Sequence, residues 1–210
     1  MASILLIQSD AAARAAISDT IGTDTTLAVC GAVDALAAAR TAIARRVPDL
    51  IIADLRLSDG PLVNLLGELR PGRSHVMVLT GSLRDPHLMH TLRHGADAYF
   101  VAGRPPHTLL NLIRRVLAGE SPMAPEIARH VLAHFNALNA HPLGAGAKKG
   151  PTQLTDAEQR LLHWISEGYV RPEIARGLGA TTQQIGLLTR SVYRRLHVDL
   201  QTRHGAPGAA

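Results

Sequence analysis

The stretch Leu50-Ile51-Ile52-Ala53-Asp54 decides the fold of this 210-residue chain. Four apolar residues in a row, closed by a carboxylate, are typical of a parallel β-strand buried on both faces. Further short apolar runs occur at residues 4–7, 27–30, 76–79 and 98–101. Asp54 is therefore expected at the carboxyl edge of a parallel sheet, where doubly wound α/β folds build their sites.

Segments with helical spacing separate these runs, at residues 11–21, 33–46, 62–69, 86–94 and 106–118. Asp10 and Asp85 are expected to cap the first and fourth of these helices. Five strands alternating with five helices predict an open, doubly wound, five-stranded parallel sheet with helices on both faces.

The composition, with 46% hydrophobic and 19% charged residues, predicts a soluble globular protein. No apolar run approaches the roughly 20 residues that span a bilayer, and the start has no basic segment typical of a signal peptide. The single cysteine, Cys30, excludes an internal disulfide and fits a reducing cytoplasm. Its apolar surroundings predict a small buried residue.

The C-terminal half differs in pattern and in charge. Residues 124–138 have apolar positions at helical spacing and predict a connecting helix, and 141–151 have the composition of a flexible linker. Thr155 and Glu158 form a capping-box pattern before a helix, residues 173–178 predict a second helix, and Thr181 is expected to cap a third. Helix, short turn and helix predict a small all-α helix-turn-helix domain.

Basic residues are concentrated in that half. Residues 1–104 hold ten Arg and ten Asp or Glu, so the net charge of +5 belongs to residues 105–210. Such asymmetry indicates a polyanionic partner, most often nucleic acid, although a merely solvated basic surface remains an alternative.

Several motifs together resemble the response regulators of the NarL/FixJ class, in which a CheY-like receiver of flavodoxin-like fold precedes a LuxR-type helix-turn-helix. The motifs lie at residues 49–57, 80–81, 94–100, 105–106, 114–120, 154–158, 173–179 and 194–198. The resemblance implies a receiver-like domain over 1–120, a linker helix and flexible linker over 121–152, a helix-turn-helix domain over 153–203 and a disordered tail over 204–210.

In such receivers Asp54 would accept the phosphoryl group, Thr80 would follow it, and Tyr99 would change rotamer in response. Two other components of the family pattern are missing. Gln8 and Ser9 replace the acidic pair that holds Mg²⁺, and Ala102 replaces the lysine that pairs with the phosphoryl group. Phosphoryl transfer needs cations at the developing charge, so we expect no efficient phosphorylation of Asp54 and no firm Mg²⁺ site. Alternatively, all three retained residues are ordinary packing or strand-end residues.

The third helix of the second domain also departs from the family pattern, because Gly186 replaces a lysine that faces DNA. We expect base contacts from Thr181, Thr182, Gln183, Gln184 and Thr189, and phosphate contacts from Arg190, Arg194 and Arg171. The alternative is that these are solvated helix-surface residues. The segment after residue 198 has little apolar periodicity, so pairing of two copies through a fourth helix is doubtful.

Eleven histidines raise the question of a metal site. His87, His90 and His94 share one helical face, and His130 and His134 share another. We expect no metal, since such sites usually add carboxylates or thiolates from elsewhere; the alternatives are a polar stripe or a pH-sensitive pairing face. Without a phosphate-cradling loop, a nucleophile elbow or a metalloprotease helix, we expect no enzyme and no catalytic residue.

The leading hypothesis is an atypical, phosphorylation-independent response regulator that binds DNA and regulates transcription in a bacterial cytoplasm. Its receiver would dock a protein partner, such as a histidine kinase or another regulator, or pair two copies. The alternative is a protein-interaction adaptor whose helix-turn-helix no longer reads DNA. A receiver-like domain that binds a small molecule is a third reading, to which no residue specifically points.

Overall fold

The computed structural model describes residues 1–69, 73–139 and 153–204, except for the side chains of 138, 139 and 198–204. The chain divides into two compact units, Met1–Ala118 and Gly119–Ala210, which are described separately. The expected flexible linker falls largely on residues 140–152, which lie outside the described residues. The expected disordered tail, 204–210, also lies outside them apart from His204, which is helical.

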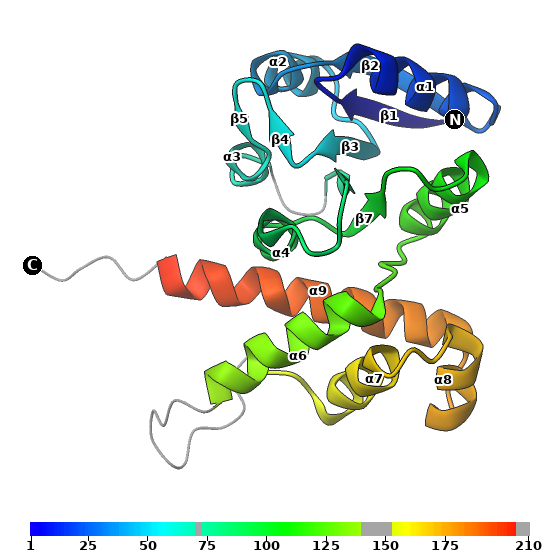
Figure 1. Ribbon diagram of the computed structural model, residues 1–210, viewed down its shortest axis with the longest axis vertical. Coiled ribbons are helices and arrows are strands. Elements are labelled where there is room, and N and C mark those ends of the chain that lie inside the picture. The colour runs from blue at the N-terminus through cyan, green and yellow to red at the C-terminus, as the bar shows by residue number, and fades with distance from the viewer. Residues whose placement is uncertain (70–72, 140–152, 205–210) are drawn as a thin grey trace, which may run out of the picture. The chain divides into compact units, whose positions relative to one another are not determined.

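A five-stranded parallel sheet forms the centre of the first unit (Figure 1). Its strands are β1 (Ala2–Ile7), β2 (Leu27–Val33), β3 (Leu50–Asp54), β6 (His75–Thr80) and β7 (Ala98–Val101). They lie in the order β2-β1-β3-β6-β7. The predicted doubly wound sheet is confirmed, and the direction of strand addition reverses between β1 and β3, where such folds open a crevice.

The helices of this unit are α1 (Ala11–Gly22), α2 (Leu36–Arg45), α3 (Val63–Leu66), α4 (Pro86–Arg93) and α5 (Pro106–Leu117). The prediction of a helix from residue 33 is wrong, because Val33 is the last residue of β2 and pairs with Ile7. The predicted helix over 62–69 shortens to α3, and the small antiparallel pair β4 (Arg56–Leu57) and β5 (Gly60–Pro61) precedes it.

Both faces of the sheet are buried, which explains the continuous apolar runs of the central strands. Ile4, Leu6 and Ile52 belong to one core cluster with Ile113 and Val116 of α5. Residues that alternate with them along the strands fill the other face and are also buried, together with apolar side chains of α2, α3 and α4: Leu5, Ile7, Ile51, Ala53, Leu36, Leu65, Leu88 and Leu92.

Carboxylates cap the helices that enter at the carboxyl edge of the sheet. Asp10 accepts a hydrogen bond from Ala13 N at 2.7 Å and Asp85 accepts one from His87 N at 2.9 Å, so both predicted caps are confirmed. Asp59 caps α2 from a distant loop by accepting from Leu36 N and Ala37 N. These two hydrogen bonds hold the pKa of Asp59 below its usual value.

Cys30 is exposed, so the prediction of a buried cysteine is wrong. Strand β2 lies at the edge of the sheet and is covered less completely than the central strands, so Cys30 and Ala32 face solvent while Leu27 is buried.

The second unit is helical. Its helices are α6 (Pro125–Asn139), α7 (Asp156–Ser166), α8 (Arg171–Leu178) and α9 (Thr182–His204). Helix α6, expected to connect the domains, packs against α7, while α7 and α8 both pack against α9. Helix α9 continues to His204, so within the described residues the segment after 198 extends the third helix. No helix in the described part of the chain has the length and apolar character needed to cross a membrane.

Glu158 holds the helix-turn-helix together from inside. Glu158 is only 1% exposed, and its carboxylate accepts hydrogen bonds from the hydroxyl group and the backbone N–H of Thr155, which together form the predicted capping box. On α9, Ser191 Oγ and Arg195 Nε donate to the same carboxylate at 2.8 Å each. Burial raises the pKa of Glu158, but the hydrogen bonds from Arg195, Thr155 and Ser191 outweigh burial and lower it.

Candidate functional site

The carboxyl edge of the sheet brings Asp54 beside Gln8. Ile7 of β1 is in register with Ala53 of β3, so the residues that follow them are neighbours at the crevice. Asp54 Oδ1 accepts a hydrogen bond from Leu55 N at 2.8 Å, and the Gln8 side chain and the Arg56 backbone also donate to this carboxylate.

Burial is the dominant influence on Asp54 and raises the pKa of its carboxyl group. The hydrogen bonds from Leu55, Gln8 and Arg56, and the charge of Arg56, act in the opposite direction without cancelling it. The Arg56 guanidinium itself reaches the Asp85 carboxylate, at 3.3 Å. The structure thus surrounds Asp54 with amide donors.

The loop that carries Gln8 and Ser9 is held by a positive charge. Gln8 is buried, and its side-chain oxygen accepts a hydrogen bond from Asp10 N at 3.1 Å. Arg14 Nη1 donates to the backbone oxygens of Gln8 and Ser9, at 2.5 and 3.3 Å. Neither Arg14 nor Arg56 was singled out from the sequence, although Arg14 lies within six residues of Gln8 and Ser9, and Arg56 lies two residues after Asp54, so both could have been noted as nearby cations.

These residues do not fit a magnesium ion. Mg²⁺ prefers oxygen ligands in octahedral geometry, usually with carboxylates. Here Gln8 turns its amide group toward Asp54, and Asp10 is occupied as the cap of α1. Within residues 1–69, 73–139 and 153–204, His, Cys, Asp and Glu side chains form no group of three that could hold a metal ion.

Thr80 is the last residue of β6, and Tyr99 lies on the neighbouring strand β7. The buried Thr80 hydroxyl donates to Ser82 O at 2.9 Å and accepts from Ser82 N at 3.2 Å, so it serves the turn after β6. Tyr99 is half-buried on β7, opposite Val78. Ala102 is exposed, and its backbone N–H donates to Thr80 O.

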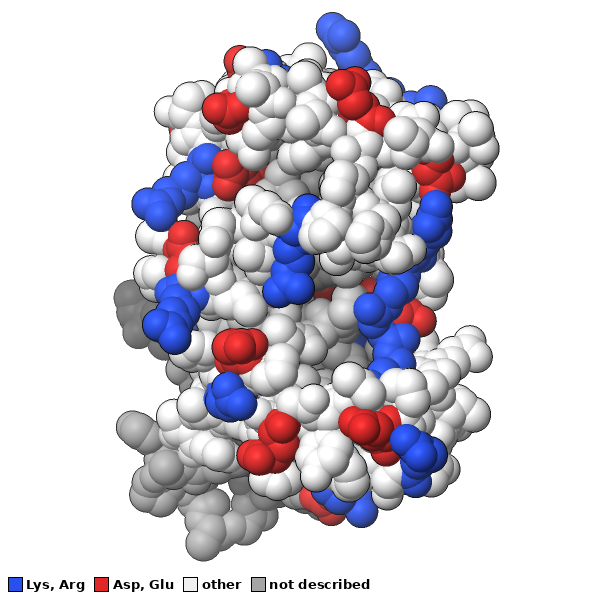
Figure 2. All heavy atoms as spheres, turned by 45° about the vertical axis from the view of Figure 1, so that its right-hand side comes forward, with Lys and Arg blue, Asp and Glu red and all other residues white. Residues whose placement is uncertain are grey.

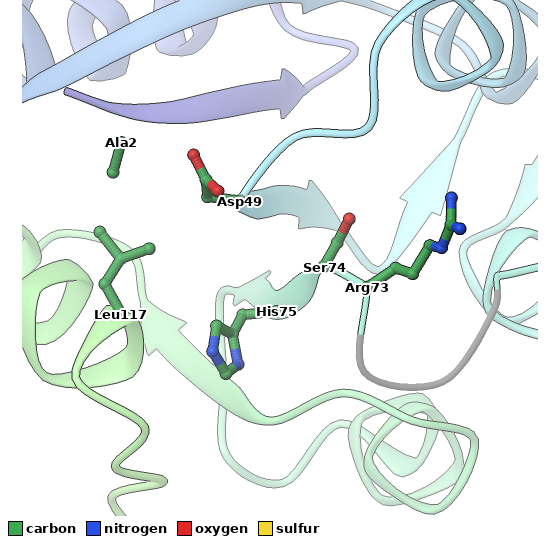
Figure 3. A pocket seen from close by; sticks show the side chains of 6 residues that line it. All are labelled: Ala2, Asp49, Arg73, Ser74, His75 and Leu117. Carbon is green, nitrogen blue, oxygen red and sulfur yellow. The ribbon is translucent and has the colours of Figure 1, made fainter.

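A shallow pocket of about 430 Å³ lies at the opposite, amino edge of the sheet (Figure 3). Asp49, Ser74 and His75 supply its polar lining, together with Ala2, Arg73 and Leu117. Asp49 is already bonded to the backbone and hydroxyl of Ser3, and Ser74 Oγ to Pro48 O. His75 Nδ1 lies 3.4 Å from an Asp97 oxygen. The pocket is therefore separate from Asp54, and its polar groups mostly serve the fold.

The start of α9 is a second capping box. Thr181 Oγ1 accepts a hydrogen bond from Gln184 N at 3.1 Å, and Gln184 Oε1 accepts one from Thr181 N at 2.7 Å. Both residues are exposed, but their side chains are used to satisfy the helix terminus. Thr182 and Gln183, which follow the cap, are exposed as well.

The other four residues expected to contact DNA differ in how far the structure leaves them available. Arg194 is exposed on α9, whereas Thr189 is only 5% exposed and donates to Ile185 O at 2.8 Å, so it lies in the core. Arg171 forms an ion pair with Glu120 at 2.6 Å, and Arg190 Nη1 lies 3.4 Å from Gly119 O. Leu187 is 53% exposed beside these cations.

The histidines show local contacts. The rings of His90 and His94 are tilted against each other at a centroid distance of 4.2 Å, His87 Nδ1 lies 2.9 Å from an Asp85 oxygen, and the rings of His134 and Phe135 form a T-shaped pair. These contacts lie within single helices or their caps.

No family model matches the chain. The curated relatives are regulators. The chain is 28% identical over 178 residues to the DNA-binding transcriptional activator DevR/DosR of Mycobacterium tuberculosis, covering 83% of this chain and 79% of that protein. It is 22% identical over 170 residues to the transcriptional regulatory protein DesR of Bacillus subtilis, covering 79% and 77%. With the nitrate/nitrite response regulator NarL of Escherichia coli it shares 24% over 151 residues, covering 71% and 68%.

Solved structures show the same fold. The response regulator RcsB of Salmonella typhimurium matches with a TM-score of 0.53 at 16% identity, over 99% of this chain and 100% of that chain. The response regulator ChrA of a heme-sensing two-component system matches with a TM-score of 0.52 at 16% identity, over 98% and 91%. By sequence and by fold, the chain is therefore related to the NarL-type response regulators, with a CheY-like receiver followed by a LuxR-type helix-turn-helix.

Proposed function

We propose that this protein is an atypical response regulator that binds DNA and regulates transcription in a bacterial cytoplasm without phosphorylation of Asp54. The observation that carries the proposal is the contact of the Gln8 amide with the Asp54 carboxylate, at the place where the family pattern has a magnesium ligand. The relatives named DNA-binding transcriptional activator and transcriptional regulatory protein support the regulatory role.

The chemistry of phosphoryl transfer supports the phosphorylation-independent part. Negative charge develops on the transferred group, and cations must lie against it. Around Asp54 the metal ligands are absent from positions 8 and 9, and position 102 holds an alanine. Arg14 is engaged by backbone oxygens and Arg56 by Asp85, so neither is placed as the missing lysine would be.

The DNA-reading part rests on the exposed residues at the start and along the outward side of α9. Thr182 and Gln183 stand at the amino end, where recognition helices contact base edges. The Gln183 amide can pair with adenine, and Arg194 supplies a charge for a phosphate. The buried Thr189 leaves this set, and Gln184 joins it only if its capping bond opens.

Phosphorylation is tested by mass spectrometry after incubation with acetyl phosphate and Mg²⁺. The wild-type protein is expected to gain no phosphoryl mass. The variant Gln8→Asp/Ser9→Asp/Ala102→Lys restores the missing groups and is expected to gain one, which shows that the assay works on this scaffold. Phosphorylation of most of the wild-type protein at Asp54 would contradict the proposal.

DNA binding is tested by selection from a random-sequence pool at about 150 mM salt, followed by fluorescence anisotropy. We expect an enriched DNA motif, for which the Gln183→Ala variant has lower affinity. For Arg194→Ala, the slope of log affinity against log salt concentration is expected to fall by about one released ion. Arg160, exposed on α7, provides the matched charge control, since Arg160→Ala is expected to have little effect.

The alternative, a protein-interaction adaptor, is favoured by the ion pair of Arg171 with Glu120 and by the burial of Thr189, which reduce the surface left for DNA. Its receiver would then pair two copies or dock a kinase or another regulator. Weak binding without an enriched motif, in the same selection, would favour this adaptor over the regulator.

A further inference from the structure

The chain enters the second unit along one side of α9. We call residues 119–122 the entry segment. Its backbone oxygens contact two side chains of α9: Gly119 O lies 3.4 Å from Arg190 Nη1, and Pro122 O accepts a hydrogen bond from Tyr193 Oη at 3.2 Å. Between them, Glu120 Oε2 lies 2.6 Å from Arg171 Nη1 at the start of α8.

Gly186 lies beneath this ion pair. A β-carbon built on Gly186 would come within 3.3 Å of Glu120 Cγ, 3.6 Å of its Cδ and 3.7 Å of Arg171 Nη1. The glycine is buried, although its position on α9 is the one at which the family pattern has a DNA-facing lysine. Its missing side chain therefore makes room for Glu120.

Residues 186, 190 and 193 are separated by four and three positions and so share one side of the helix. The entry segment covers that side at three successive points. The neighbouring stripe, with Gln183, Leu187 and Arg194, stays exposed. The side of α9 that carries Gly186, Arg190 and Tyr193 is thus covered by the chain itself.

The chemistry of the contact resembles that of a DNA backbone. A carboxylate and a phosphate both accept charge-assisted hydrogen bonds from a guanidinium, and the same donor cannot serve both fully. On the face shown in Figure 2, acidic and basic side chains are interspersed, without a large field of one sign.

We propose that the entry segment is an internal competitor of DNA, with the Glu120 carboxylate occupying the place of a backbone phosphate on Arg171. DNA binding then requires that Glu120 leave Arg171 and that the segment uncover Gly186 and Arg190. The inference rests on the proposed DNA-binding function and adds that the entry segment lowers the affinity for DNA. Because the pair is partly exposed, with both side chains at 25%, the restraint is modest and reversible.

The direct test is the DNA affinity of the full-length Glu120→Gln variant, measured by anisotropy over a range of salt concentrations. Glu126→Gln is the matched control, because Glu126 is exposed on the first turn of α6 and its substitution makes the same change in net charge. Relative to this control, Glu120→Gln is expected to bind about three- to tenfold more tightly, with a salt slope steeper by about one ion, since Arg171 becomes available to a phosphate.

A second variant leaves the charge unchanged. In Gly186→Ala the added β-carbon displaces Glu120, so DNA affinity is expected to rise in the same direction by a smaller factor. If Glu120→Gln binds no more tightly than Glu126→Gln, or if Gly186→Ala weakens binding, the competitor role is wrong while the DNA-binding function stands. If the wild type and all three variants fail to bind DNA even at about 50 mM salt, the regulatory function is overturned as well.

Discussion

The indole ring of Trp164 on α7 lies against Gly177 on α8 with no space for a side chain between them. A β-carbon on Gly177 would lie 2.6 Å from the ring atom Cη2 and 2.8 Å from Cζ2. The ring also contacts the Tyr169 ring in a tilted arrangement, at a centroid distance of 4.6 Å. This contact sets how closely the first two helices of the helix-turn-helix approach each other.

Substitution Gly177→Ala is therefore expected to destabilise the second unit. The steric cost of overpacking, about 1–3 kcal/mol, opposes the gain of about 1 kcal/mol that alanine brings to a helix. Trp164 is the only tryptophan, so its fluorescence during urea unfolding reports this unit. Gly22→Ala is the control, because a β-carbon at Gly22 meets nothing within 4 Å. Its stability, measured by circular dichroism during unfolding, is expected to be unchanged or higher.

Removal of the Glu158 charge is expected to destabilise the second unit more than Gly177→Ala does. Glu158→Gln keeps the size of the side chain but breaks the buried contact with Arg195, a change worth roughly 3 kcal/mol. Because the folded-state pKa of Glu158 is lowered, its contribution is present above the unfolded pKa and is lost as pH falls through the folded value. The difference between wild type and variant should thus narrow in acid; an equal difference at pH 7 and pH 3 would contradict this assignment.

Asp54 is expected to show the opposite dependence on pH. Burial raises the pKa of Asp54, so ionising this carboxyl group costs more free energy in the folded protein than in the unfolded one. The contribution of the group to stability is therefore fully present in acid, below its unfolded pKa, and is lost as the pH rises through its folded pKa. Asp54→Asn should consequently raise the unfolding midpoint of the first unit at pH 7, with the gain shrinking toward pH 4. Denaturation followed by circular dichroism at both pH values measures it, and a loss of stability at pH 7 would count against the burial argument.

Cys30 is expected to react in the native protein. It is exposed on the edge strand β2, so an aromatic disulfide reagent should modify one thiol per chain without denaturant. The rate in urea should exceed the native rate by less than about tenfold. A thiol that reacts only after unfolding would show that β2 is covered in solution, for example by a second copy.

The sheet could be predicted from sequence because each buried strand is a short apolar run and the runs alternate with helical segments. Asp10, Asp85 and Thr155 were predicted as caps for the same local reason, since a cap bonds to residues two or three positions away. Thr181 was predicted to cap α9, and this is confirmed, but two further local signals were not used in predicting the DNA contacts. Gln184 has the spacing of the second member of a capping box, and Thr189 shares the apolar face of Ile185 and Val192.

The contacts that decide the candidate sites could not be predicted in this way. Glu120 and Arg171 are 51 positions apart, and no periodicity indicates that they meet. From the sequence, Gly186 was noted only as the replacement of a lysine, whereas its packing against Glu120 depends on the tertiary fold. The burial of Gln8 beside Asp54 likewise depends on the order of β1 and β3. Whether Asp54 is phosphorylated and whether α9 reads DNA stay predictions.

The unbroken length of α9 has a mechanical consequence. At 1.5 Å per residue, its 23 residues form a rod of roughly 35 Å. Arg195, clamped by Glu158, is 12 residues or about 18 Å from Gln183 at the exposed end. A continuous helix transmits rotation along its axis with little loss, so the buried contact between Glu158 and Arg195 determines the orientation of the amino end of α9. A small rotation of the helix at Arg195 would turn Gln183 by the same angle. The orientation of Gln183 is therefore fixed by the Glu158 carboxylate, which is buried and remote from the exposed end of α9.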